Sequence, residues 1–283
     1  MSRGGHPTER LPIVRYRDGR ATGGSDLLAG EEPLEVRLEG EAVAVTMRTP
    51  VPGQDAELAI GFLIGEAIIT PGQVARASEC RAETGDGGVV DVRLWPDACP
   101  APGWQKGEQR NFYATSSCGI CGKASIEAVK VAAGAVADGP TIEPDVLSAM
   151  PDALRAGQRV FDRTGGLHAA GIFGADGRLF VVREDVGRHN AVDKAVGRTA
   201  MDGLLPLSGH VLMVSGRASF EIVQKALVAG VPIVAAVSAP STLAVRLAKE
   251  GNMTLVGFLR DGGFNVYAGS ERLSSAPIPQ NRQ

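Results

Sequence analysis

Alternation of hydrophobic and polar positions predicts a small strand-rich unit in the first part of the chain. Strands are expected at residues 34–38, 42–47 and 89–94, with the first two joined as a hairpin. Residues 55–69 carry apolar side chains at helical spacing and predict a helix. Residues 1–30 are rich in glycine, arginine and polar groups, so we expect them to form a flexible N-terminal tail.

A segment rich in proline and glycine separates this unit from the rest of the chain. Residues 96–110 contain three prolines and two glycines, a composition typical of a linker. We therefore expect a small N-terminal α+β domain over residues 31–110 and a second domain over residues 111–270. Residues 271–283, which contain two prolines, are expected to form a disordered tail.

Helix and strand patterns alternate regularly in the second domain. Helices are expected at residues 144–161, 188–199, 219–229 and 241–250, and directly after Cys121. Strands are expected at residues 167–173, 178–183, 210–215, 231–237 and 253–259. This order predicts a three-layer α/β domain with a mixed sheet, so the chain as a whole is α+β.

Composition and charge favour a globular protein of the cytoplasm. The 283 residues are 44% hydrophobic and 22% charged, which suits a chain with a sizeable core. The net charge of −3 provides no general attraction for nucleic acid or an anionic membrane, so any anion site must be local. The N-terminus lacks the apolar core of a signal peptide, and the longest apolar stretch, residues 227–239, is too short to span a bilayer. We expect a cytoplasmic protein without nucleic-acid or membrane partners.

Two of the four cysteines lie in a Cys-Gly-Ile-Cys-Gly segment at the expected start of a helix. Ser116 or Ser117 can cap this helix, which places Cys118 near the positive end of the helix dipole. Such a position lowers the pKa of a thiol and favours the reactive thiolate. Lys123 adds a cation nearby. The pattern predicts that Cys118 and Cys121 form a reactive pair.

Other chemistry stays open for these two cysteines. A structural zinc site needs two more ligands in a similar pair, whereas Cys80 and Cys99 are isolated in the sequence. A thioredoxin-like redox pair would follow the first strand of a βαβ unit, but a linker-like region precedes Thr115. Thiol–disulfide exchange is therefore an alternative, and a purely structural role is disfavoured because the segment is polar and rich in glycine.

Small and polar residues follow three of the expected strands. The segments are residues 215–219, 238–242 and 257–263, and two of them contain an arginine. Glycine lets backbone amides approach an anion and arginine binds phosphate oxygens, although each segment alone also fits an ordinary turn with a helix cap. Together they favour a phosphate-bearing ligand beyond the carboxyl ends of the strands.

The segment Arg183–Lys194 is dense in charged groups. Its acidic residues fit the solvated start of a helix, where negative charge is favourable: Glu184, Asp185 and Asp193. Arg188 and His189 lie at the same end and oppose the helix dipole, a conflict that an anionic ligand would remove. His168 lies in a mainly apolar strand, which favours a hydrogen-bonded core histidine over a ligand-binding one.

Taken together, these segments resemble the formate dehydrogenase accessory sulfurtransferase family, known as FdhD. The resemblance runs from about Val36 to Tyr267. A single CxxC would carry little weight, whereas six blocks in the same order are specific. The blocks are MRTP with ELAIGFL (residues 47–50 and 57–63), CGICG (118–122), TGGLHAA (164–170), REDVGRHNAVDK (183–194), SGRASFEIVQK (215–225) and GFLR (257–260).

The resemblance implies a sulfur carrier for the maturation of a molybdenum cofactor. Members of the family take persulfide sulfur from a cysteine desulfurase and pass it to the bis-molybdopterin guanine dinucleotide cofactor, which is then inserted into formate dehydrogenase. By motif position, Cys118 carries the persulfide and Cys121 assists its transfer. The cofactor-binding stretch corresponds to Phe258, Leu259, Arg260, Asp261, Gly262 and Gly263. The resemblance also implies a homodimer and a C-terminal domain similar to the cytidine deaminase fold.

Two rival functions accompany this resemblance. Zinc-dependent base deamination needs His-x-Glu followed by Pro-Cys-x-x-Cys. Here the CxxC precedes His168, Ser117 replaces the proline and Ala170 stands where the glutamate is needed. We therefore expect no bound zinc and no other resident metal. A cofactor-binding chaperone that transfers no sulfur is the alternative function.

Overall fold

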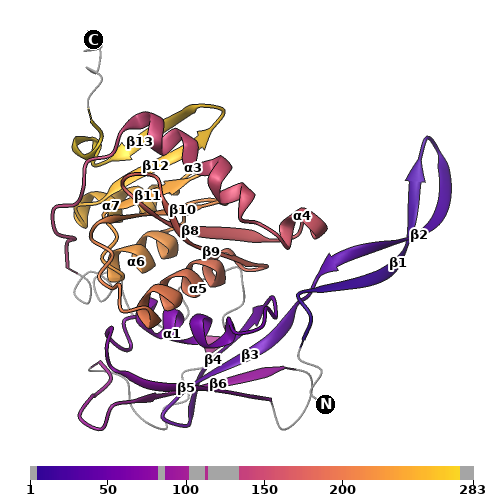
Figure 1. Ribbon diagram of the computed structural model, residues 1–283, viewed down its shortest axis with the longest axis horizontal. Helices are drawn as coiled ribbons and strands as arrows, with labels where there is room; N and C mark the ends of the chain where they lie inside the picture. The colour runs from indigo at the N-terminus through magenta and orange to yellow at the C-terminus, as the bar shows by residue number, and fades with distance from the viewer. Residues whose placement is uncertain (1–4, 82–86, 102–111, 114–133, 275–283) are drawn as a thin grey trace.

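A computed structural model shows a mixed α/β protein whose described part contains three β-sheets (Figure 1). The structure describes residues 5–81, 87–101, 112–113 and 134–274. One sheet is a two-stranded hairpin, one has five strands from the first part of the chain, and one has six strands from the second part. The α/β class expected from the sequence is confirmed.

The five-stranded sheet has the order β5-β6-β3-β4-β7. Its strands are β3 (Glu32–Leu38), β4 (Glu41–Arg48), β5 (Val74–Arg81), β6 (Gly88–Leu94) and β7 (Phe112–Tyr113). The predicted hairpin is confirmed as β3 and β4, and the predicted third strand as β6. Helix α1 (Asp55–Gly65) packs on this sheet, against alternate side chains of β3 that are fully buried. The sequence pattern did not indicate β5, which pairs with β6 at the edge of the sheet.

The six-stranded sheet has the order β13-β12-β11-β10-β8-β9. Its strands are β8 (His168–Gly174), β9 (Leu179–Asp185), β10 (His210–Val214), β11 (Ile233–Ala236), β12 (Thr254–Arg260) and β13 (Gly263–Ala268). Strands β10, β11 and β12 are parallel, whereas β8, β9 and β13 pair antiparallel with their neighbours. The predicted mixed sheet is therefore confirmed, with β13 as an additional strand.

Helices cover both faces of this sheet. They are α3 (Pro144–Ala156), α5 (Arg188–Met201), α6 (Phe220–Val228) and α7 (Thr242–Glu250). The short helix α4 (Phe161–Thr164) lies instead beside β2. Along β8, Ala169 and Phe173 pack in the hydrophobic cluster that contains α3. Ala170 and Ile172 point to the opposite face and pack in the cluster that contains α5, α6 and α7. This alternation confirms the predicted three-layer arrangement.

The two larger sheets are joined through α1 and α5, which lie side by side between them (Figure 1). The two helices cross at a pair of glycines. A Cβ atom built on Gly61 would lie 1.8 Å from the carbonyl oxygen of Asp193, and one built on Gly197 would lie 1.8 Å from the carbonyl oxygen of Glu57. Only glycine permits this approach, and a single hydrophobic cluster runs across the crossing.

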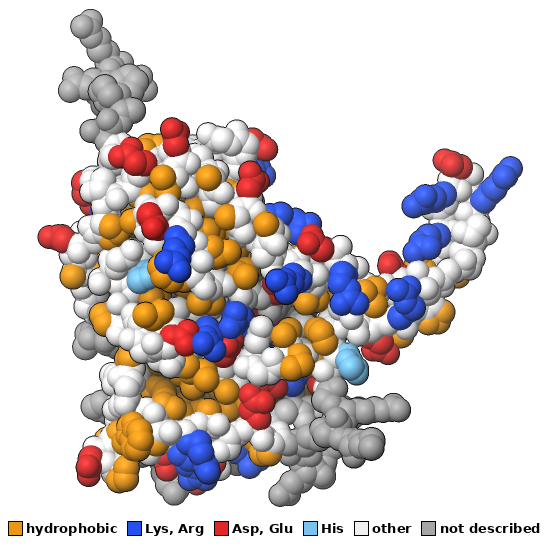
Figure 2. Space-filling model, viewed as in Figure 1, with side chains coloured by type: hydrophobic (Ala, Val, Ile, Leu, Met, Phe, Trp, Pro, Cys, Tyr) orange, Lys and Arg blue, Asp and Glu red, His pale blue; other side chains and the backbone are white. Residues whose placement is uncertain are grey.

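Residues 8–29 differ from the expectation of a flexible tail. They form β1 (Thr8–Arg17) and β2 (Arg20–Ala29), an antiparallel hairpin that projects from the body (Figure 1). The hairpin turns at Asp18-Gly19, where both residues have positive φ. Most of its side chains are exposed, and arginines are spread along it (Figure 2). The sequence did not reveal these strands because neither face is buried, so hydrophobic alternation is weak.

Several further predictions are either revised by the structure or concern residues that it does not describe. The helix expected at residues 144–161 is divided, because α3 ends at Ala156 and α4 begins at Phe161. Of the linker expected at residues 96–110, the last nine lie outside the described residues, and the domain boundary placed there stays a prediction. The helix after Cys121 and most of the tail at residues 271–283 also lie outside them. The similarity to the cytidine deaminase fold likewise stays a prediction. Among the described residues, no helix is long and apolar enough to cross a membrane.

Candidate functional site at the carboxyl edge of the six-stranded sheet

Both cysteines expected to carry the chemistry, Cys118 and Cys121, lie outside the described residues. The other two cysteines, Cys80 and Cys99, are exposed and free. Among the residues that the structure does describe, no group of three or more His, Cys, Asp or Glu side chains could hold a metal ion. The candidate site is therefore built from the described sheet edge where the sequence predicts a phosphate-bearing ligand.

The three strand exits predicted to bind an anion lie next to one another. The amide of Ser238 donates to the carbonyl of Gly216 over 3.3 Å, and the amide of Phe258 donates to the carbonyl of Ser238 over 3.1 Å. Strand β8 runs antiparallel to β10 and therefore begins at this edge, where the amide of Ala169 donates to Ser215 Oγ over 2.8 Å. The edge thus brings His168 beside the exit of β10.

A pocket of about 590 Å³ opens between this edge and the helices α3 and α4. Its lining includes the apolar side chains of Leu154 and Phe161 and the polar side chains of Gln158, His168 and Ser215. A mainly apolar pocket with a few convergent polar groups is the usual form of a small-molecule site.

Arg188, His189 and Arg217 act electrostatically on His168, near the start of α5. Burial lowers the pKa of His168 below its ordinary value of 6.5, and the positive charges of Arg188, His189 and Arg217 lower it further. The backbone of Gly216 lies against the imidazole, because a Cβ atom built there would be 3.4 Å from Nδ1. His168 is thus a half-buried imidazole in a positive environment, which corrects the expectation of an ordinary core histidine.

His189 is held by residues at the start of α6. Its Nε2 lies 2.7 Å from Glu221 Oε2 and 3.2 Å from Ser219 Oγ. Burial alone would raise the pKa of Glu221, but the hydrogen bond and charge of His189 bring it below its ordinary value. The contact with His189 therefore favours the ionised form of Glu221.

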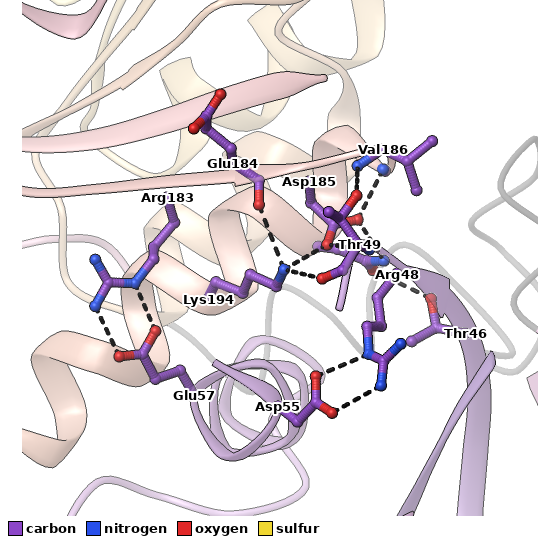
Figure 3. Close-up of polar contacts among 12 residues, drawn as sticks. Thr46, Arg48, Thr49, Asp55, Glu57, Arg183, Glu184, Asp185, Val186 and Lys194 are labelled. Carbon is purple, nitrogen blue, oxygen red and sulfur yellow. Dashed lines mark hydrogen bonds and ion pairs between the residues drawn. The ribbon is translucent and has the colours of Figure 1, made fainter. Parts of the chain in front are cut away.

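The remaining charged residues of the segment Arg183–Lys194 are structural. Glu184, Asp185 and Asp193 are buried, which corrects their assignment to a solvated helix start. Arg183 forms a two-point ion pair with Glu57 of α1, at 2.5 and 2.7 Å (Figure 3). The close-up also shows Arg48 paired with Asp55, at 2.8 Å for both contacts.

A completely buried ion pair lies at the centre of this network. Lys194 Nζ is 2.6 Å from Asp185 Oδ2 and donates to the carbonyl of Thr49 over 3.0 Å (Figure 3). Asp185 also accepts the amides of Thr49 and Gly187 and the side-chain amide of Asn190. These contacts connect the end of β4 to the start of α5. The sequence could not reveal the contacts with Thr49, because Thr49 lies 136 residues before Asp185 and 145 residues before Lys194.

A second buried pair joins α5 to α6. Lys225 Nζ lies 2.7 Å from Asp193 Oδ1. Burial raises the pKa of Asp193 to about 6, although Lys225 lies beside it. Burial alone would lower the pKa of Lys225, but the charge of Asp193 raises it above its ordinary value. After these structural residues are set aside, the charged residues that remain in the segment are Arg188 and His189, which begin α5.

The stretch expected to bind the cofactor forms the hairpin turn between β12 and β13. Leu259 is fully buried in the core, so its side chain is not available to a ligand. Arg260 pairs with Gly263 across the turn, and Asp261 and Gly262 have positive φ. The guanidinium of Arg260 lies 5.8 Å from the ring centre of Phe258, which is partly exposed. The turn therefore presents Arg260 and open backbone at Gly262 and Gly263.

Comparison with known proteins identifies the family. The model of the FdhD/NarQ family matches residues 29–274. A protein named sulfur carrier protein FdhD from Streptomyces avermitilis is 53% identical over 281 residues, covering 95% of this chain and 97% of the relative. One of the same name from Mycobacterium tuberculosis is 51% identical over 261 residues, covering 88% and 92%. A crystal structure assigned as a formate dehydrogenase accessory protein from Desulfotalea psychrophila shares the fold, with a TM-score of 0.72 at 22% identity over 94% of this chain and 99% of that chain. The chain belongs to the FdhD/NarQ family.

Proposed function

We propose that this protein is a sulfur carrier that supports formate dehydrogenase. The observation that carries the proposal is the near full-length similarity to proteins named sulfur carrier protein FdhD, at 53% identity over 95% of the chain. The sequence supplies a CxxC pair with the local features of a reactive thiolate. Sulfur transfer needs such a nucleophile.

In the proposed reaction, the thiolate of Cys118 attacks the terminal sulfur of a persulfide on a cysteine desulfurase. A new sulfur–sulfur bond forms at Cys118, and the donor cysteine leaves as a thiolate. Cys121 then attacks Sγ of Cys118 and releases the outer sulfur as hydrosulfide to the cofactor. The resulting disulfide returns to two thiols by exchange with a thiol reductant.

Intact-mass and peptide mass spectrometry test the persulfide step. After incubation with a cysteine desulfurase and cysteine, we expect the peptide that contains Cys118 to gain the mass of one sulfur atom. Cys118→Ala should abolish the gain, whereas Cys80→Ala should retain it because Cys80 is an exposed cysteine outside the pair. A gain found only on Cys80 or Cys99 contradicts the proposal.

The proposed sulfur acceptor is the bis-molybdopterin guanine dinucleotide cofactor, bound as cargo and then delivered to the catalytic subunit of formate dehydrogenase. The turn at Phe258–Gly263 would bind a phosphate of its guanine nucleotide through Arg260. The bis form of the cofactor contains two guanine nucleotides, one in each dinucleotide, and we propose that the carrier works as a homodimer.

Calorimetric titration with GDP tests the role of Arg260. A charge-assisted contact contributes about 1.5–3 kcal/mol, so Arg260→Ala should weaken GDP binding about ten- to a hundredfold. The matched control is Arg178→Ala, because Arg178 lies in the same way over an exposed phenylalanine, 5.2 Å from the ring centre of Phe180. Equal GDP affinity in Arg260→Ala and wild type would place the nucleotide elsewhere.

The alternative function is a cofactor-binding chaperone without sulfur transfer. It predicts that Cys118→Ala, which still binds GDP, restores formate dehydrogenase activity in cells that lack the protein. The sulfur carrier predicts no restoration by that variant.

A further inference from the structure

The hairpin of β1 and β2 projects from the body as a separate two-stranded sheet (Figure 1). Every residue from Arg20 to Asp26 in β2 is exposed. An isolated two-stranded hairpin is at best marginally stable in water. An open strand edge also presents amides and carbonyls that can pair with another chain. The hairpin therefore has the form of an arm that a further strand would complete.

The register of the hairpin shows which backbone groups of β2 face outward. The amide of Gly30 donates to the carbonyl of Pro7, and hydrogen-bonded pairs alternate with non-bonded pairs along an antiparallel ladder. Even-numbered residues of β2 therefore bond to β1, whereas Ala21, Gly23 and Ser25 point their amides and carbonyls away from it. The carbonyl of Ser25 accepts from the guanidinium of Arg15 over 3.0 Å, which leaves this carbonyl one lone pair.

Of the two edges, that of β2 is the better suited to pairing. Pro12 occupies an outward position of β1, opposite Ser25, and proline has no amide to donate. Residues 21–25 of β2 have small side chains or none, so another backbone can approach closely. A Cβ atom built on Gly23 would meet nothing within 4 Å.

Charges along the arm are unbalanced near its tip. Arg17 and Arg20 lie directly opposite each other at exposed positions, and like charges in such a pair destabilise a sheet. Asp26 lies on the same face of β2 as Arg20, because an even number of residues separates them. Its Oδ1 accepts the amide of Leu27 over 2.9 Å, and the carboxylate has further lone pairs. The edge of β2 thus carries a cation at one end and an anion at the other, which makes it complementary to its own reversed copy.

We propose that β2 pairs antiparallel with β2 of a second copy of this chain, around a two-fold axis at Gly23. Ala21 then lies opposite Ser25 of the second copy, and Arg20 lies opposite its Asp26. The outward backbone groups of both copies pair, and each Arg20 gains an anion. A register shifted by two residues would instead place Arg20 opposite Gly24 or Leu28, without a charge match. This inference rests on the homodimer proposed above and assigns the surface that forms it.

The exposed ring of Tyr16 fits the same arrangement. Its side chain is 76% exposed and stands next to Ala21, on one face of the hairpin. In the proposed pairing, Ser25 of the second copy follows Ala21 on that face. The ring can therefore cover small side chains on both sides of the seam, as aromatic residues do in cross-strand pairs.

Sedimentation velocity of the full-length protein tests the arm pairing. A thiol reductant in the buffer excludes disulfides between copies. The seam is small, so we expect a reversible dimer with a dissociation constant of about 1–100 μM. Arg20→Glu and Asp26→Arg should each raise this constant about tenfold or more, because each places like charges opposite one another at two symmetric positions. A wild type that stays monomeric throughout this range overturns the proposal.

An equal mixture of Arg20→Glu and Asp26→Arg tests the register itself. In a mixed dimer the introduced carboxylate of one copy faces the introduced guanidinium of the other, and native Arg20 faces native Asp26. We therefore expect the mixture to dimerise with about wild-type affinity, although neither variant does so alone. Misfolding could not produce this rescue. Monomers that persist in the mixture, while the wild type dimerises, overturn the proposed register.

Proline placed on each edge provides a matched pair of variants. Gly23→Pro removes the outward amide at the two-fold axis from both copies, so it should weaken dimerisation about tenfold or more. Val14→Pro removes the outward amide of the residue directly opposite Gly23, on the edge of β1, and should dimerise as the wild type does. Equal dissociation constants for the two variants would contradict pairing through β2.

The proposed sulfur chemistry is measured separately. Arg20→Glu retains Cys118 and Cys121, so after incubation with a desulfurase it should still gain one sulfur atom. A wild-type dimer that the arm variants leave unchanged overturns the arm pairing but not the homodimer. Absence of the sulfur gain in the wild type overturns the sulfur carrier but not the arm pairing.

Discussion

At the scale of single residues, the most consequential group is the buried amine of Lys194. Its side chain and that of Asp185 are completely buried. The pair also holds the backbone around Thr49, which belongs to the other half of the molecule. Removing one member of such a pair leaves a charge that has lost its water and its counterion.

We predict that Lys194→Met lowers the free energy of unfolding by about 3–5 kcal/mol, because Asp185 is left buried without a cation. Urea denaturation followed by circular dichroism measures this loss. The control is Arg198→Met, which breaks a half-exposed pair with Asp202 and should cost less than about 1 kcal/mol. Adding Asp185→Asn to Lys194→Met should recover part of the loss. Equal stability of Lys194→Met and wild type would show that the pair is not needed for folding.

The sequence marked the right segment at this scale but not the role of each residue. It singled out Arg188 and His189 as cations at the wrong end of a helix, and the structure confirms that both begin α5, where His189 contacts Glu221 and Ser219 of the next helix. The same segment contains Arg183, whose partner Glu57 lies on a helix 126 residues earlier. Such a partner is set by tertiary packing, so local pattern reasoning could not identify Arg183 as a structural arginine.

At the scale of elements, the crossing of α1 and α5 depends on two glycines. Replacing a helical glycine with alanine normally stabilises a protein by about 0.5–1 kcal/mol. At Gly197 the added methyl group would lie 1.8 Å from the carbonyl oxygen of Glu57, so the helices would have to separate. Because of this steric clash, we expect Gly197→Ala to lower the stability of the protein instead of raising it.

We predict that Gly197→Ala lowers the free energy of unfolding by about 2 kcal/mol or more, as expected for overpacking at a rigid contact. Thermal and urea unfolding provide the measurement. Gly209→Ala is the matched control, because a Cβ atom built at Gly209 meets nothing within 4 Å. A Gly197→Ala variant as stable as the control would mean that α1 can move away from α5 at little cost.

The projecting hairpin allows the opposite prediction. None of the residues of β1 and β2 belongs to the buried hydrophobic core. A chain that begins at Gly30 keeps Arg48 and its partners Glu32 and Asp55. We expect its melting temperature to fall by no more than about 3 °C, the size expected for 1 kcal/mol in a chain of this length. A much larger fall in differential scanning calorimetry would show that the hairpin supports the body.

Strands with at least one buried face could be predicted from the sequence, whereas strands with both faces exposed could not. Strands β8, β10, β11 and β12 were found because their apolar runs lie between covered faces. Strand β13 was missed because residues 257–263 were interpreted as a ligand-binding segment, although Asp261-Gly262 is also a strong hairpin signal. The exposed strands β1 and β2 lack the alternation that burial imposes.

At the scale of the whole molecule, the two larger sheets share one hydrophobic cluster. It contains Leu34 and Val36 of β3, Leu58 of α1, Val192 of α5 and Leu212 of β10. The polar network between Thr49 and Lys194 crosses the same junction. Few contacts would be kept if one sheet unfolded alone, so the halves should unfold together.

Hydrogen exchange measured by mass spectrometry tests this coupling. We predict that, as urea is added, peptides from β3 and β10 lose protection with the same free energy, because each sheet exposes the shared cluster when the other opens. Lys194→Met should lower the two values equally, since the buried pair connects the sheets and belongs to neither alone. Removal of the projecting hairpin should change neither value. Protection of β10 that persists after β3 has exchanged would show that the sheets fold as separate units, and that the helix crossing only docks them.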